Sequence, residues 1–178
     1  MDAFPPELRE LELAAAEAGA GAEPRLAAGR AWGSRREGSQ RENLERAAAH
    51  FEAAAALLGV AGDASGEARA LRELAEALLV SPDMDRAAPL ARAEEALRRA
   101  LGLLPPGEHR ERGLAEQDLA FSYVLLPEGN RQYNMVRAVS ALERAEAEFE
   151  ALGDPAALDQ VRANLAIARE QLRHASRL

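Results

Sequence analysis

The amino-acid sequence predicts an all-α protein in which antiparallel helix pairs stack side by side into an α-solenoid. The composition favours helix, because alanine supplies roughly a quarter of the chain, threonine is absent and other β-branched residues are sparse. Apolar and small residues recur at the alternating three-and-four spacing that marks one face of a helix. The same pattern returns at a fixed interval along the chain, which indicates a repeat array.

Two series of residues share this interval. In the second-helix series, Ala47, Ala93 and Ala138 are separated by 46 and 45 residues. In the first-helix series, the pairs Leu74-Ala75, Leu119-Ala120 and Leu165-Ala166 are separated by 45 and 46 residues, and Ala28-Gly29 lies one step earlier. Large residues follow at a constant offset, as Phe51, Leu97 and Leu142 in one series and as Trp32, Leu78 and Tyr123 in the other.

The first half of the chain contains four expected helices, over residues 6–18, 23–33, 41–58 and 65–80. The first carries apolar residues at Leu8, Leu11, Leu13 and Ala15. The third shows the helical pattern most fully, at Leu44, Ala47, Ala48, Phe51, Ala54, Ala55 and Leu58. Gly59 follows directly and is its expected stop.

Four more helices are expected over residues 85–103, 109–126, 132–152 and 155–175. Pro105-Pro106-Gly107 closes the first of these, and Gly129 and Gly153 lie where the next two should stop. Asp154-Pro155 supplies an N-cap and a first-turn proline for the last. Because the connections are short, consecutive helices should be antiparallel, and pairs must stack to bury their apolar faces.

The two series resemble the tetratricopeptide repeat. That family carries Leu followed by Gly or Ala in its first helix, and spaced alanines with a large residue between them in its second. The present period of about 45 residues exceeds the standard of about 34, and Arg169 replaces the large residue of the last unit. The array is similar to long-repeat variants that lie beside bacterial caspase-like (CHAT) proteases, where phrases like Glu42-Asn43-Leu44-Glu45-Arg46-Ala47 recur.

The resemblance implies a single tetratricopeptide-like domain over residues 1–178. Residues 1–21 would form an N-terminal capping helix, 22–58, 65–104 and 108–152 the repeat units, and 155–178 a C-terminal capping helix. The resemblance also implies that the first helix of each pair lines a concave face that binds a partner. Matched to that pattern, the expected partner-binding residues are Arg30, Arg72, Glu76, Gln117, Phe121, Val124 and Ile167.

Phe121 leaves two interpretations open. Leu119 and Tyr123 already occupy the packing face, so Phe121 would be exposed in the groove, where aromatic anchors dominate binding. Alternatively, it packs against the longer helices of this variant. The Lys/Asn clamp with which some family members grip a carboxylate is absent, since the chain has no lysine.

Composition and motifs argue against several other functions. The net charge of −8 disfavours a phosphate-backbone binder, and the lack of cysteine excludes disulfides and thiolate metal sites. No segment is apolar for the roughly 20 residues that a membrane helix needs, and the N-terminus lacks a signal-peptide pattern. We therefore expect a cytoplasmic protein without membrane contact. His50, His109 and His174 lie far apart with no metal-binding spacing, so we expect no metal, cofactor or catalytic site.

Arg46, Arg92 and Arg137 recur at one repeat position. They are predicted to form structural ion pairs between adjacent units. The function that the sequence favours is a non-enzymatic interaction module, a scaffold that binds a peptide or partner protein on its concave face. The alternative is a self-associating structural protein that stacks through its terminal helices, since residues 6–18 present several leucines.

Overall fold

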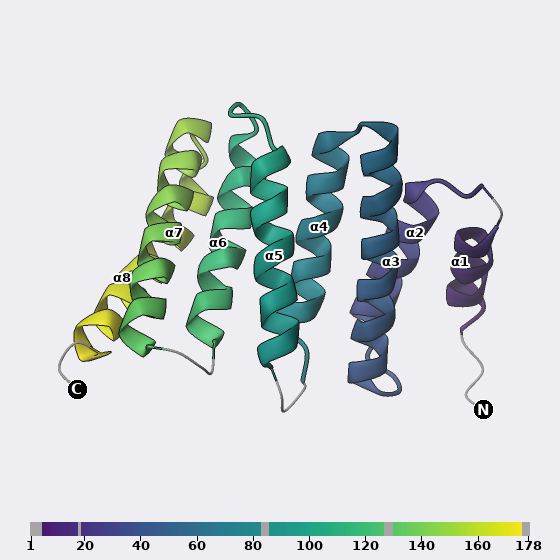
Figure 1. Cartoon of the computed structure of the whole chain (residues 1–178), viewed down its shortest axis with the longest axis horizontal. Helices are drawn as coiled ribbons and strands as arrows, with labels where there is room; N and C mark the ends of the chain where they lie inside the picture. The colour runs from purple at the N-terminus through teal and green to yellow at the C-terminus, as the bar shows by residue number, and fades with distance from the viewer. Residues whose placement is uncertain (1–4, 18, 83–85, 127–129, 176–178) are drawn as a thin grey trace.

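The computed structural model describes residues 5–17, 19–82, 86–126 and 130–175, and over these ranges it contains eight α-helices and no strand. The helices are α1 (Pro6–Ala16), α2 (Ala22–Ser34), α3 (Gln40–Ala61), α4 (Ala64–Leu79), α5 (Ala87–Leu103), α6 (His109–Leu125), α7 (Arg131–Leu152) and α8 (Pro155–Ala175). Each packs against the next along the chain, so that they form one extended row (Figure 1). The predicted all-α solenoid is confirmed, and the helix bounds agree to within three residues.

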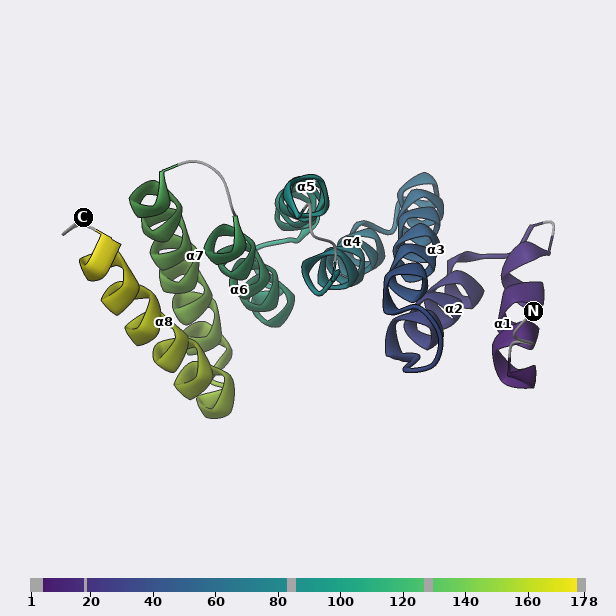
Figure 2. The same cartoon turned by 90° about the horizontal axis from the view of Figure 1, so that it is seen from below.

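The row has two sides. Figure 2 shows α3, α5 and α7 on one side and α2, α4, α6 and α8 on the other, and the row arches so that the second group lies on its inner, concave side. α4 and α6, which are not consecutive in the chain, also contact each other directly. The first helix of each pair therefore faces the hollow.

The two repeating series form the core. Ala47, Ala93 and Ala138 have no exposed surface, so they occupy the same environment in successive units. Their small side chains let neighbouring helices approach closely, and the large residues at the constant offset fill the remaining space. Ala166 of α8 belongs to the first-helix series, in which Ala75 and Ala120 are buried. It is exposed because the described chain supplies no further helix to pair with α8.

One predicted helix end is wrong. α3 continues past Gly59 and ends at Gly62, whose φ of +76° is the left-handed conformation that glycine favours. Gly59 serves a different purpose, because a Cβ there would lie 2.7 Å from Oε2 of Glu67 in α4. Gly153 ends α7 as predicted, with φ +71°, and Gly129 lies outside the described residues.

At Gly113 the backbone of α6 also approaches a neighbouring helix closely, and this contact predicts an effect of mutation on stability. A Cβ at this buried position of α6 would lie 2.8 Å from the ring of Phe149, which is itself buried. Gly113→Ala should lower the free energy of unfolding by about 1–2 kcal/mol, because overpacking outweighs the gain in helix propensity. Gly102→Ala is the matched control: its Cβ would meet nothing within 4 Å, so it should not destabilise. Urea denaturation measures the free energy of unfolding of both variants. Equal values for the two variants would contradict the close packing of Gly113 against Phe149.

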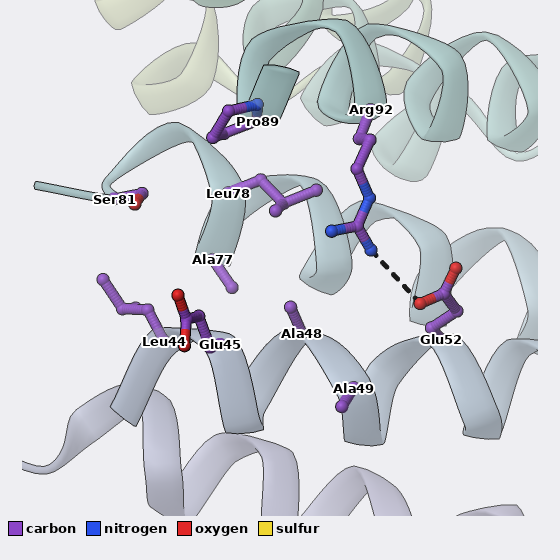
Figure 3. Close-up of a pocket in the computed structure, with 10 residues that line it drawn as sticks. All are labelled: Leu44, Glu45, Ala48, Ala49, Glu52, Ala77, Leu78, Ser81, Pro89 and Arg92. Atoms are coloured by element: carbon purple, nitrogen blue, oxygen red, sulfur yellow. Dashed lines mark hydrogen bonds and ion pairs between the residues drawn. The ribbon is translucent and has the colours of Figure 1, made fainter. Parts of the chain in front are cut away.

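The recurring arginines join adjacent units in two places, as predicted. Nη2 of Arg92 in α5 lies 3.2 Å from Oε2 of Glu52 in α3, and Figure 3 shows this pair spanning the crevice between the two helices. Arg137 of α7 pairs with Glu94 of α5. Each pair links the second helices of neighbouring units.

The same arginine position makes a contact that sequence reasoning missed. The guanidinium of Arg46 lies 4.7 Å from the centre of the Trp32 ring, and that of Arg137 lies 3.8 Å from the centre of the Tyr123 ring. These are cation–π contacts within one helix pair. The signal was present in the sequence, because both rings occupy the large position of the first-helix series.

The N-terminal helix uses much of its apolar face within the chain. Leu8 is buried in the core, whereas Leu13 is 61% exposed. Glu12 anchors the helix, because its carboxylate accepts a hydrogen bond from Nε1 of Trp32 and lies 3.1 Å from Nε2 of His50. α1 thus covers the first repeat unit, and Leu13 is its exposed leucine.

Candidate functional site

An apolar pocket opens on the concave side between α6 and α8. Its cavity measures about 350 Å³. Ala120, Phe121 and Val124 of α6 form one wall, Asn164, Ile167, Ala168 and Gln171 of α8 the other, and Leu142 of α7 lies at its base. We call this cavity the concave pocket. Three of the predicted partner-binding residues, Phe121, Val124 and Ile167, come together in it.

The structure decides between the two interpretations of Phe121. Leu119 and Tyr123 are buried on the packing side of α6, while Phe121, between them, is 49% exposed. Ile167 occupies the matching repeat position of α8 and is 56% exposed. Val124 lies one turn after Phe121 and is half-buried. Two large apolar side chains therefore face solvent from opposite walls of one cavity.

The end of the pocket near the C-terminus of α6 is polar. Nη1 of Arg131 in α7 donates to the carbonyl of Val124 at 2.8 Å, and Nη2 donates to Oε1 of Gln171 at 3.4 Å. The guanidinium thus satisfies a carbonyl of the last turn of α6 and joins that turn to α8. Sequence reasoning did not assign Arg131, Asn164 or Gln171 to the partner-binding surface, because none of them falls on the repeat positions that were matched to that surface.

A second group of charged residues lies between α4 and α6 on the same side. Arg72 pairs with Glu76 one turn later, its Nε lies 3.7 Å from Oε2 of Glu111, and its Nη1 lies 3.6 Å from Oδ2 of Asp118. One guanidinium thus faces three carboxylates, a group that we call the Arg72 cluster. Burial, together with the charge of Glu76, raises the pKa of Asp118 to about 7, although the charge and hydrogen bond of Arg72 act in the opposite direction.

The other predicted site residues are placed as follows. Arg30 of α2 makes a bidentate pair with Glu73 of α4, with Nη2–Oε1 and Nε–Oε2 distances of 2.6 and 2.9 Å. That geometry makes Arg30 a link between first helices. Gln117 is half-buried and lies four residues before Phe121, so both project from the same side of α6.

A crevice on the opposite, convex side of the array is a weaker candidate. It measures about 240 Å³ and lies between α3 and α5 over the end of α4 (Figure 3). Ala48, Ala77 and Leu78 in its walls are buried, and the Arg92–Glu52 pair crosses it. Because its apolar walls are already covered, we interpret it as a seam between repeat units.

The histidines take part in structural contacts. His50 faces Glu12, and Nδ1 of His109 lies 2.7 Å from Oε2 of Glu148, which also pairs with Arg112. Within the described ranges, no three residues of the types His, Cys, Asp and Glu form a group that could hold a metal ion.

No family model matches the chain, and no curated protein matches it significantly. Among the described helices, none combines the length and the apolar character that crossing a membrane requires.

Proposed function

We propose that this protein is a non-enzymatic, tetratricopeptide-like interaction module that binds a segment of a partner protein in its concave pocket. The observation that carries this proposal is the exposure of Phe121 and Ile167 in facing walls of one cavity. A residue needed only for packing would be covered, as Leu119 and Leu165 are in the same helices. Because each side chain is about half-exposed, the surface that it leaves in water forgoes about 1 kcal/mol, and a partner that covers both side chains gains that energy.

The architecture supports the same proposal. The pocket is built on helices, and its walls are held in place by contacts beneath it. Ala120 in its wall and Leu142 at its base are buried, and Arg131 connects the end of α6 to α8. A surface that is already ordered loses little conformational entropy on binding, so its apolar contacts contribute fully to affinity.

The test is a quantitative comparison of captured partners. Tagged wild-type protein and the double variant Phe121→Ser with Ile167→Ser are used to capture proteins from native lysate, and the bound proteins are identified by mass spectrometry. We expect the variant to lose at least one partner by tenfold or more, a loss of about 1.4 kcal/mol or more in binding free energy.

The control is Val136→Ser, which changes an apolar side chain of α7 that is also exposed and does not line the pocket. It should retain all partners of the wild type. Circular dichroism must show the same helix content for all three proteins. Identical partner sets for the wild type and the double variant would refute binding through the concave pocket.

A further inference from the structure

We propose that the partner segment carries an apolar side chain that enters the concave pocket and a lysine or arginine that reaches the Arg72 cluster. This inference rests on the proposed function and specifies the chemistry of the partner. The apolar pocket and the charged group are adjacent, because α6 contributes residues to both.

The apolar end of the site selects the first feature of the partner. Phe121 and Ile167 present large apolar surfaces, and the half-buried Val124 lines the same cavity. Asn164 and Gln171 add uncharged polar groups to the α8 wall. Such a cavity accepts an aliphatic or aromatic side chain and excludes a charged one, which would lose its hydration without gaining a partner.

The charged end selects the second feature. Glu76, Glu111 and Asp118 surround the single guanidinium of Arg72, so the carboxylates outnumber the cation when they are ionised. The side chain of Glu76 is half-exposed and is the carboxylate that a partner can reach. A cation on the partner is attracted to this group, whereas an acidic residue is repelled.

The opposite end of the pocket determines on which side of the apolar anchor the partner's cation lies. Arg131 already donates to the Val124 carbonyl and to Gln171, so positive charge lies at that end. A cation on the partner is therefore favoured toward α4 and disfavoured toward the start of α7. The electrostatic asymmetry gives the partner segment one preferred orientation along the groove.

The geometry sets the spacing within the partner. Asp118 and Phe121 lie one turn apart on α6, and packed helices have axes about 8–10 Å apart. An extended chain covers about 3.3 Å per residue. The cation should therefore follow or precede the apolar anchor by about three residues in an extended segment.

Random peptides displayed on phage provide the test. Peptides are selected on the wild-type protein and counter-selected on Phe121→Ser, so that only binders that depend on the pocket remain. We expect lysine or arginine to be enriched about three residues from an aliphatic or aromatic residue. The best peptide is then synthesised with a fluorescent label, together with a version in which glutamine replaces the cation.

Fluorescence polarisation at low salt completes the test. Glu76→Gln should lower the affinity for the cationic peptide by about threefold, which is the size of an exposed ion pair. It should leave the affinity for the glutamine peptide unchanged. Glu95→Gln, the same charge change on the convex side of α5, should affect neither peptide. Pocket-dependent peptides that are acidic or show no charge preference would overturn this inference and leave the proposed function standing. A selection that yields no pocket-dependent peptide would overturn both.

Discussion

Replacing Phe149 with alanine is expected to lower the free energy of unfolding by about 3–5 kcal/mol. The ring is 1% exposed near the end of α7, and it fills the space above Gly113 of α6. Alanine would leave a cavity there, because the helices on either side cannot close the gap without losing other contacts. Urea denaturation followed by far-ultraviolet circular dichroism measures the effect. The loss is a large share of the roughly 5–15 kcal/mol that stabilises a typical domain.

The matched control lies in the same helix. Val136→Ala removes apolar atoms from a side chain that is about half-exposed, and it should change stability by no more than about 0.5 kcal/mol. If Phe149→Ala cost no more than this control, the packing of α6 against α7 described above would be refuted.

The second large effect concerns pH. Because burial raises the pKa of Asp118 from 3.8 to about 7, the folded protein holds a proton that the unfolded chain has lost between these two values. Folding stability therefore falls as pH rises through this window, and above about pH 7 the ionised carboxylate opposes folding. Asp118→Asn removes the titrating group. The variant should be more stable than the wild type at pH 8 by about 2 kcal/mol, after allowance for partial exposure.

The difference between the variant and the wild type is the quantity to measure. It should shrink toward pH 5, because Asp118 of the folded wild type is then protonated. Arg72 keeps Glu76 and Glu111 as partners in the variant. Asp159→Asn, at an exposed carboxylate of α8, serves as the control and should change stability by no more than about 0.5 kcal/mol. A constant difference for Asp118→Asn between pH 5 and pH 8 would contradict the raised pKa.

The candidate site was partly predictable. The repeat register placed Phe121 and Ile167 at matching positions, and the structure brings both into one pocket. The register could not establish that Phe121 is exposed, because a residue two positions off the packing face points either to solvent or to a neighbouring unit. That outcome depends on how far α6 and α8 stand apart, which no local pattern encodes.

The charged residues were harder to interpret from sequence. Arg72 and Glu76 were expected to face a partner, but Asp118 and Glu111 were not assigned to the site. Glu111 and Asp118 lie 39 and 46 residues after Arg72 in the sequence, and they meet it only because α4 and α6 pack together. The ion pairs of Arg92 and Arg137 between units were predicted from sequence. A residue that recurs with the repeat period faces an equivalent neighbour in each unit.

The sequence by itself determined the eight helices, their order and the residues that bury their faces. These properties follow from local rules: the spacing of apolar residues, the recurrence of small ones, and caps such as Asp154, whose Oδ1 accepts from the backbone amides of Ala156 and Ala157 at 3.1 Å. Only the tertiary structure decided which exposed side chains share a pocket and which carboxylates share a cation. Those features depend on the distances between helices distant in sequence, and these distances are set by the summed packing of the whole array.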